Sequence, residues 1–77
     1  MNSVNKNEER NAVLHSFGYN LRKIRESKGL TQEEVAYIAC FSRSYYTEVE
    51  QGKRNLSLLN IYKLAKALNI SITQLFS

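Results

Sequence analysis

The chain has 77 residues, a formal net charge of +4, one cysteine and no proline. A chain of this length forms a single domain that buries only about 60% of its unfolded surface, so dimerisation would help to stabilise it. One cysteine excludes an internal disulfide and fits a reducing cytoplasm. No apolar run approaches the ~20 residues of a membrane span, and the N-terminus lacks the apolar core of a signal peptide. The excess of Lys and Arg weakly favours a polyanionic partner, and the abundance of helix-forming residues predicts an all-α fold.

The N-terminal segment, residues 1–7, is polar and is predicted to be flexible, and the folded domain is predicted to span residues 8–77. Asn7, followed by two glutamates, predicts an N-cap with an acidic first turn. The first helix is predicted to run to about Lys28, and Gly29 is suited to end it.

The interior of this first helix has one weak point. Gly18 lowers helix propensity in the middle, so a start near Ser16 is the alternative. Apolar residues at helical spacing predict its buried stripe, which is Val13, Phe17, Leu21 and Ile24.

Two short helices joined by a tight turn are predicted within residues 32–51. Thr31 opens the first of them, and Glu34, three residues later, completes a capping box. Phe41 lies in the turn, where it can fill the angle between the helices, and Ser42 is an N-cap for the second helix. The positions predicted to face inward are Val35, Ala36, Ala39, Tyr46 and Val49.

Two further helices complete a predicted compact five-helix bundle. Ser57 caps the fourth, whose buried stripe is predicted to be Leu58, Ile61, Leu64, Ala65 and Leu68. Asn69 is an acceptable end residue, and Ser71 with Gln74 predicts a capping box that opens a fifth helix over residues 72–76. Apolar residues near the end of the chain can close the core or meet a second copy of the chain. The predicted dimer interface is Ile70, Ile72, Leu75 and Phe76, with Leu75 mostly inward.

The outward side of the third helix carries hydrogen-bonding side chains on a rod narrow enough for the major groove of DNA. The candidate base contacts are Ser42, Arg43, Ser44, Thr47 and Glu48. An Arg can donate to guanine O6 and N7, and a Glu can accept from cytosine N4. The candidate backbone contacts are Thr31, Gln32, Tyr45, Gln51, Lys53, Arg54 and Asn55. For Tyr45, packing and a DNA contact are equally open, and the basic loop after Gly52 has a solvated turn as its alternative.

The phrases GLTQEEVA, FSRSY, E-x-G-KRN and SLLNIYKLAKALNI resemble the helix-turn-helix of the Cro and phage-repressor family over roughly residues 18–76. The stretch RSYYTEVEQGKRNLSLLNI is most similar to the controller proteins of restriction-modification systems. The resemblance implies a homodimeric, sequence-specific regulator that binds a palindromic operator in double-stranded DNA. It also implies control of a restriction endonuclease gene and of the regulator's own promoter. RNA polymerase is a further candidate partner, and the bacterial cytoplasm, on the nucleoid, is the expected location.

The resemblance also implies roles for particular residues. Gln32 and the backbone N–H groups beside it would face a DNA phosphate, with an ordinary exposed polar residue as the alternative. Glu50 would pair with Arg25. The family usually has Gly where this chain has Cys40, and that position often needs a positive φ, which costs a non-Gly residue about 1 kcal/mol.

No metal site, cofactor site or catalytic set is predicted. His15 and Cys40 are the only soft metal ligands and lie far apart along the chain, and the chain has no Asp for a Ser-His-Asp set. His15 is expected at the surface or packed on the first helix, and Cys40 is expected to be a small buried residue in the turn. The chain is therefore not predicted to be an enzyme.

Two other functions stay open. A phage or plasmid repressor or an antitoxin would use the same chemistry. A helix-turn-helix used as a protein-interaction module would carry apolar or acidic residues on the outward face of the third helix.

Overall fold

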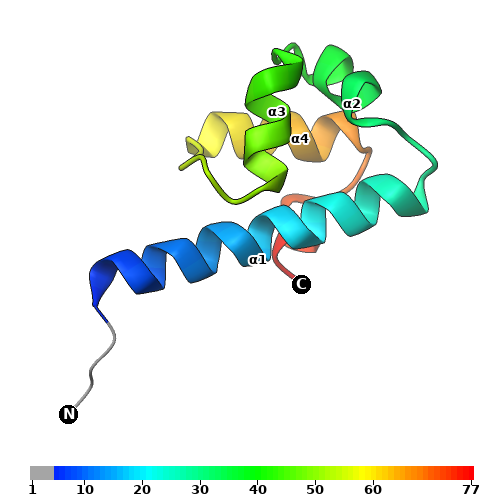
Figure 1. The fold of residues 1–77 in the computed structure, drawn as a ribbon. Helices are drawn as coiled ribbons and strands as arrows, with labels where there is room; N and C mark the ends of the chain where they lie inside the picture. The colour runs from blue at the N-terminus through cyan, green and yellow to red at the C-terminus, as the bar shows by residue number, and fades with distance from the viewer. Residues whose placement is uncertain (1–4) are drawn as a thin grey trace.

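The structure, a computed structural model, describes residues 5–77. Within these residues, four α-helices and a closing 3-10 helix follow one another (Figure 1). They are α1 (Lys6–Ser27), α2 (Gln32–Ala39), α3 (Arg43–Glu50), α4 (Leu58–Ala67) and η1 (Ile72–Phe76). The all-α fold is confirmed, but the predicted fifth α-helix is wrong: its place is taken by η1, since so short a segment closes as a 3-10 turn. None of the helices within the described residues is both long enough and apolar enough to cross a membrane.

The first helix, α1, begins earlier than predicted. The Asn5 side chain accepts from the Glu8 N–H at 2.8 Å, and the Glu8 carboxylate accepts from the Asn5 N–H at 3.2 Å. A capping box needs its Glu three residues after the cap, which makes Asn5 the N-cap and the prediction of Asn7 wrong. Residues 5–7 therefore belong to the helix and its cap rather than to a flexible segment, and the rest of that predicted segment lies outside the described residues.

Two glycines mark where α1 touches the end of α3 and the loop that follows. A Cβ on Gly18 would lie 2.4 Å from the Glu50 carbonyl oxygen and 2.7 Å from that of Val49. Gly52, with a φ of +76°, faces the Cα of His15, which would be 2.9 Å from an added Cβ. α1 passes through Gly18 unbroken, so the alternative start near the middle of the helix is wrong. The residue that weakens α1 locally is the one that lets α3 approach its backbone.

The core lies among the four α-helices and is closed by η1. Its fully buried large side chains are Leu21, Val35, Tyr46, Val49, Leu64, Leu68 and Leu75. Asn20 Nδ2 on α1 donates to the carbonyls of Leu75 at 3.3 Å and Ser77 at 3.0 Å, which ties the end of the chain to α1. Leu75 is 0% exposed, which confirms its predicted inward position and leaves no part of its surface for the predicted dimer contact.

Two residues of the predicted buried stripes are exposed. Val13 is 61% exposed and Leu58 is 74% exposed. Val13 lies toward the N-terminal end of α1, which extends past the other helices (Figure 1). Leu58 is the first residue of α4, and a helical side chain leans toward the N-terminus, here beyond the edge of the core. Both residues keep the helical spacing of a buried stripe, but no other element covers them.

Candidate nucleic-acid interface

The carboxylate of Glu50 joins three helices beneath the predicted DNA-contacting surface. Its Oε2 accepts from Arg25 Nε at 2.6 Å and from the Tyr46 hydroxyl. Its Oε1 accepts from Arg25 Nη2 at 3.1 Å and from Gln32 Nε2 at 2.9 Å. Arg25 Nη1 also donates to the Leu30 carbonyl at 2.8 Å. The side chains of Arg25 and Glu50 are only 11% and 3% exposed, so the predicted ion pair is confirmed and is largely buried.

This hydrogen-bond network fixes the charge states of its members. Burial alone would raise the pKa of the Glu50 carboxyl, but the hydrogen bonds from its three partners outweigh burial, and the pKa lies below its usual value. The hydrogen bond to Glu50 raises the pKa of Arg25. Burial and then the hydrogen bond to Glu50 raise the pKa of Tyr46. At neutral pH the site therefore holds a carboxylate, a guanidinium and a neutral phenol.

The turn between α2 and α3 contains a residue in the left-handed conformation that glycine adopts most easily, and that residue is Cys40. Cys40 has φ 63° and ψ 37°, in the left-handed region. The turn that the resemblance implies is therefore kept, at a strain of about 1 kcal/mol. Cys40 is exposed, so the prediction that it is buried is wrong: this backbone conformation leaves its side chain at the surface. Ser42 Oγ accepts from the Tyr45 N–H at 3.0 Å, which confirms the predicted N-cap of α3.

The candidate base contacts all lie at the start and on the outward face of α3. Ser42, Arg43 and Ser44 are exposed, while Thr47 and Glu48 are half-buried. Besides Ser42, which caps α3, two of them already have partners within the protein. Thr47 Oγ1 donates to Gln32 Oε1 at 3.4 Å, and Glu48 Oε1 accepts from Arg54 Nε at 2.7 Å.

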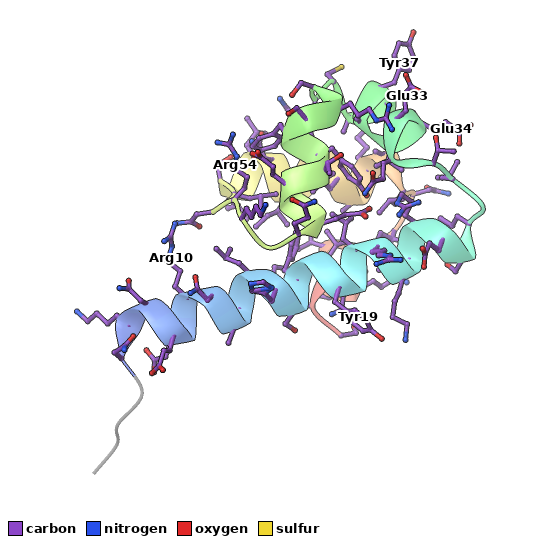
Figure 2. All side chains as sticks on the ribbon, in the orientation of Figure 1. Arg10, Tyr19, Glu33, Glu34, Tyr37 and Arg54 are labelled. Carbon is purple, nitrogen blue, oxygen red and sulfur yellow. The ribbon has the colours of Figure 1, made fainter. Side chains whose placement is uncertain are left out.

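The candidate backbone contacts surround that face. Thr31, Gln51, Lys53, Arg54 and Asn55 are exposed, and Gln32 and Tyr45 are half-buried. The amide of Gln32 has two N–H donors, one of which is engaged by Glu50, so one remains for a phosphate. In Figure 2, Arg54 projects from the loop that follows α3.

Tyr45 makes several contacts within the protein that the sequence does not indicate. Its ring and that of Phe41 form a T-shaped pair with centroids 5.1 Å apart, and the guanidinium carbon of Arg54 lies 5.5 Å from the Tyr45 centroid. Its hydroxyl accepts from Asn60 Nδ2 at 3.1 Å. Asn60 was not predicted as part of the site, and no local pattern identifies it, because the contact joins α4 to α3. The bond from Tyr46 to Glu50 was missed as well, although its i, i+4 spacing is a usable signal.

Comparison with known proteins places the chain in a family. Residues 21–75 match the HTH_3 helix-turn-helix family. The chain is 41% identical over 68 residues to the control protein C.MunI from Mycoplasma sp., and the match covers 87% of this chain and 92% of that protein. The crystal structure of the restriction-modification controller protein C.AhdI from Aeromonas hydrophila is similar, with a TM-score of 0.83 and 51% identity over 84% of this chain and 98% of that one.

A second similar structure is the tetramer of the restriction-modification controller protein C.Esp1396I in complex with its natural 35 base-pair operator. Its TM-score is 0.77 at 33% identity, over 83% of this chain and 84% of that one. The family match spans α2, α3 and α4 in full, together with the part of α1 that carries Arg25. The chain belongs to the HTH_3 helix-turn-helix family.

Proposed function

We propose that this chain is a sequence-specific regulator of transcription that binds operator DNA as a homodimer. One observation carries the proposal. Glu50 holds the C-terminal end of α3 against α1 and α2, while the N-terminal end of α3 presents polar side chains to solvent beside a basic loop. A helix fixed at one end and polar at its exposed end fits a major groove. The polar character of this face is not what a protein-interaction module would need.

The contact proposed for each residue follows from its position on α3 or in the loop after it. Arg43 is in the first turn of α3, and its planar guanidinium suits guanine O6 and N7. Ser42, Ser44 and Thr47 offer hydroxyl groups to neighbouring base edges. Lys53 lies in the loop after α3, where a cation meets the sugar-phosphate backbone.

Dimerisation is proposed through the apolar residues of the C-terminal segment. Phe76 is 55% exposed even though its ring packs on Phe17 with centroids 5.3 Å apart. Ile70 and Ile72 are half-buried. A two-fold dimer built on this surface would place the two α3 helices about 34 Å apart, one turn of DNA, on an approximately palindromic operator. The C.Esp1396I tetramer on its operator is a precedent among the similar proteins.

The similarity to control proteins of restriction-modification systems supports a target in such a system, with the gene for this chain among the regulated genes. We expect the protein to lie on the nucleoid in the bacterial cytoplasm, with RNA polymerase as a candidate partner. A restriction endonuclease gene immediately downstream would support this target, and phage or toxin genes there would favour a repressor or antitoxin.

A salt titration of DNA binding tests the proposed function. Arg43→Ala is expected to weaken operator binding by about 1–3 kcal/mol and to relax the preference at one base pair in each half-site. Lys53→Ala is expected to weaken operator and random DNA alike and to lower the slope of log K against log salt by about one per phosphate contact. The reverse pattern, with the preference changed by Lys53→Ala alone, would show that α3 does not contact the bases.

Sedimentation velocity tests the dimer. Phe76→Ser is expected to shift the protein toward monomer at micromolar concentration. Tyr37→Ser is the matched control, since Tyr37 is an aromatic residue 84% exposed on α2, away from the C-terminal segment. Wild-type protein that stays monomeric with and without DNA would contradict the dimer.

A further inference from the structure

The loop residue Arg54 and the helix residue Glu48 are joined on the surface proposed to meet DNA. Arg54 Nε donates to Glu48 Oε1 at 2.7 Å, and the two side chains are 51% and 38% exposed. DNA can therefore reach both members of the pair. From the sequence, Arg54 is predicted to contact the DNA backbone and Glu48 is predicted to contact a base.

A second contact fixes the guanidinium of Arg54. Its central carbon lies 5.5 Å from the ring centroid of Tyr45, within the range of a cation–π interaction. The Tyr45 ring is itself held by Phe41 on one side and by the hydrogen bond from Asn60 on α4. Arg54 is thus held at two points, by a carboxylate and by a ring whose own position depends on α3 and α4 together.

The pair leaves the atoms needed for DNA available. Within the described residues, Arg54 makes its hydrogen bond through Nε, so the N–H groups of its two Nη atoms remain donors. Glu48 is engaged through Oε1, and its Oε2 remains an acceptor. Because the guanidinium is planar and donates along two edges, Arg54 can hold Glu48 with one edge and bind a phosphate with the other.

We propose that Glu48 and Arg54 act as one unit that couples a base contact to a backbone contact. Arg54 is the positioning residue: it holds the Glu48 carboxylate where Oε2 can accept from cytosine N4, and it binds a phosphate through its Nη groups. The inference rests on the proposed DNA-binding function. It also accounts for a carboxylate on a DNA-facing helix, because an unpaired negative charge near phosphates would oppose binding.

The coupling predicts that a cation in the loop affects sequence preference. Arg54→Lys keeps the charge but removes the planar Nε edge that holds Glu48. A good base contact discriminates by roughly 5- to 150-fold. Arg54→Lys is therefore expected to reduce the preference for cytosine at the contacted base pair by about fivefold or more, toward the value for Glu48→Gln, with the salt slope unchanged. The double variant is expected to lose no further preference.

The experiment measures dissociation constants of the full-length protein on the operator and on operators with single-base changes, at several salt concentrations. The double-mutant cycle comprises wild type, Arg54→Lys, Glu48→Gln and the double variant. Lys63→Arg is the matched control, a charge-conserving change at an exposed position of α4 outside the candidate contacts, and is expected to alter neither preference nor slope. In DNA-free protein, the Arg54 Nε–H signal in NMR spectra is expected to exchange with water faster in Glu48→Ala than in wild type.

Several results would overturn the coupling. One is an Arg54→Lys variant with wild-type preference at every position, and another is preference losses that add in the double variant. An Arg54 Nε–H signal that Glu48→Ala leaves unchanged would also overturn it. If Arg43→Ala relaxes preference while Arg54→Lys does not, only the coupling is wrong. If wild type does not discriminate operator from random DNA, the proposed function fails and the coupling fails with it.

Discussion

Replacing Glu50 by alanine is expected to lower the free energy of unfolding by about 3–5 kcal/mol. The change leaves the guanidinium of Arg25, only 11% exposed, without its counter-charge, and removing one partner of a buried ion pair costs about that much. The Tyr46 hydroxyl and the Gln32 amide lose an acceptor at the same time. Since a small domain is stable by roughly 5–15 kcal/mol in total, the loss would be a large share of the whole.

Thermal and urea denaturation followed by circular dichroism measures this loss. A cycle of Glu50→Ala, Arg25→Ala and the double variant is expected to be non-additive, with the double variant less destabilised than the sum of the two. Glu26→Ala is the control, because its ion pair with Arg22 joins side chains 61% and 52% exposed and is worth about 0–1 kcal/mol. A Glu50→Ala variant within about 0.5 kcal/mol of wild type, close to the scatter of surface substitutions, would refute the reasoning.

The same network makes stability depend on acid pH. The pKa of Glu50 is depressed in the folded protein, so the unfolded chain binds the proton more tightly. Its contribution to stability is present above the unfolded pKa, about 4.3, and is lost as the pH falls from there through the folded pKa. The stability of Glu50→Gln, measured over the same acidic range, is expected to fall less steeply than that of wild type. Parallel curves would mean that Glu50 titrates alike in both states.

Two further substitutions test the backbone. Gly18→Ala is expected to cost about 1–3 kcal/mol despite the better helix propensity of Ala, because the new Cβ would lie 2.4 Å from the Glu50 carbonyl oxygen; Ser16→Ala, at an exposed position on the same helix, is the control in urea melts. Cys40→Gly is expected to raise the free energy of unfolding by about 0.5 kcal/mol through relief of its positive φ, and Asn69→Gly, at φ 58°, to raise it less, since Asn tolerates that region better. A Cys40→Gly variant less stable than wild type would mean that the turn carries no strain.

Much of the local structure could be predicted because its causes are local. The caps at Thr31, Ser42 and Ser57 each depend on residues within three positions, and all three form. Burial is different, because helical spacing shows which side chains share a face but not whether another element covers that face. Val13 and Leu58 have the right spacing and are exposed for this reason.

The candidate site also has parts that the sequence predicts and parts that it does not. The position of Arg43 on the first turn of α3 follows from the sequence alone. The pairing of Glu48 with Arg54 does not, because the path of the loop after Gly52 decides it. The contact of Asn60 with Tyr45 does not either, because it joins α3 to a helix, α4, that packs mainly on α2 and η1. The family resemblance supplied the one long-range pair that was predicted, Arg25 with Glu50.

The hydrogen bonds to the Glu50 carboxylate help to keep the two short helices, α2 and α3, folded. α2 and α3 have eight residues each, too few to be stable helices in water on their own. They persist because the hydrogen bonds to Glu50 and the core around Tyr46 hold them against α1. Their amide protons should therefore exchange with solvent only when α1 separates from them, in one cooperative opening. A helix already ordered before it meets DNA spends none of the binding free energy on folding its backbone, so a smaller part of the gain from its contacts is offset.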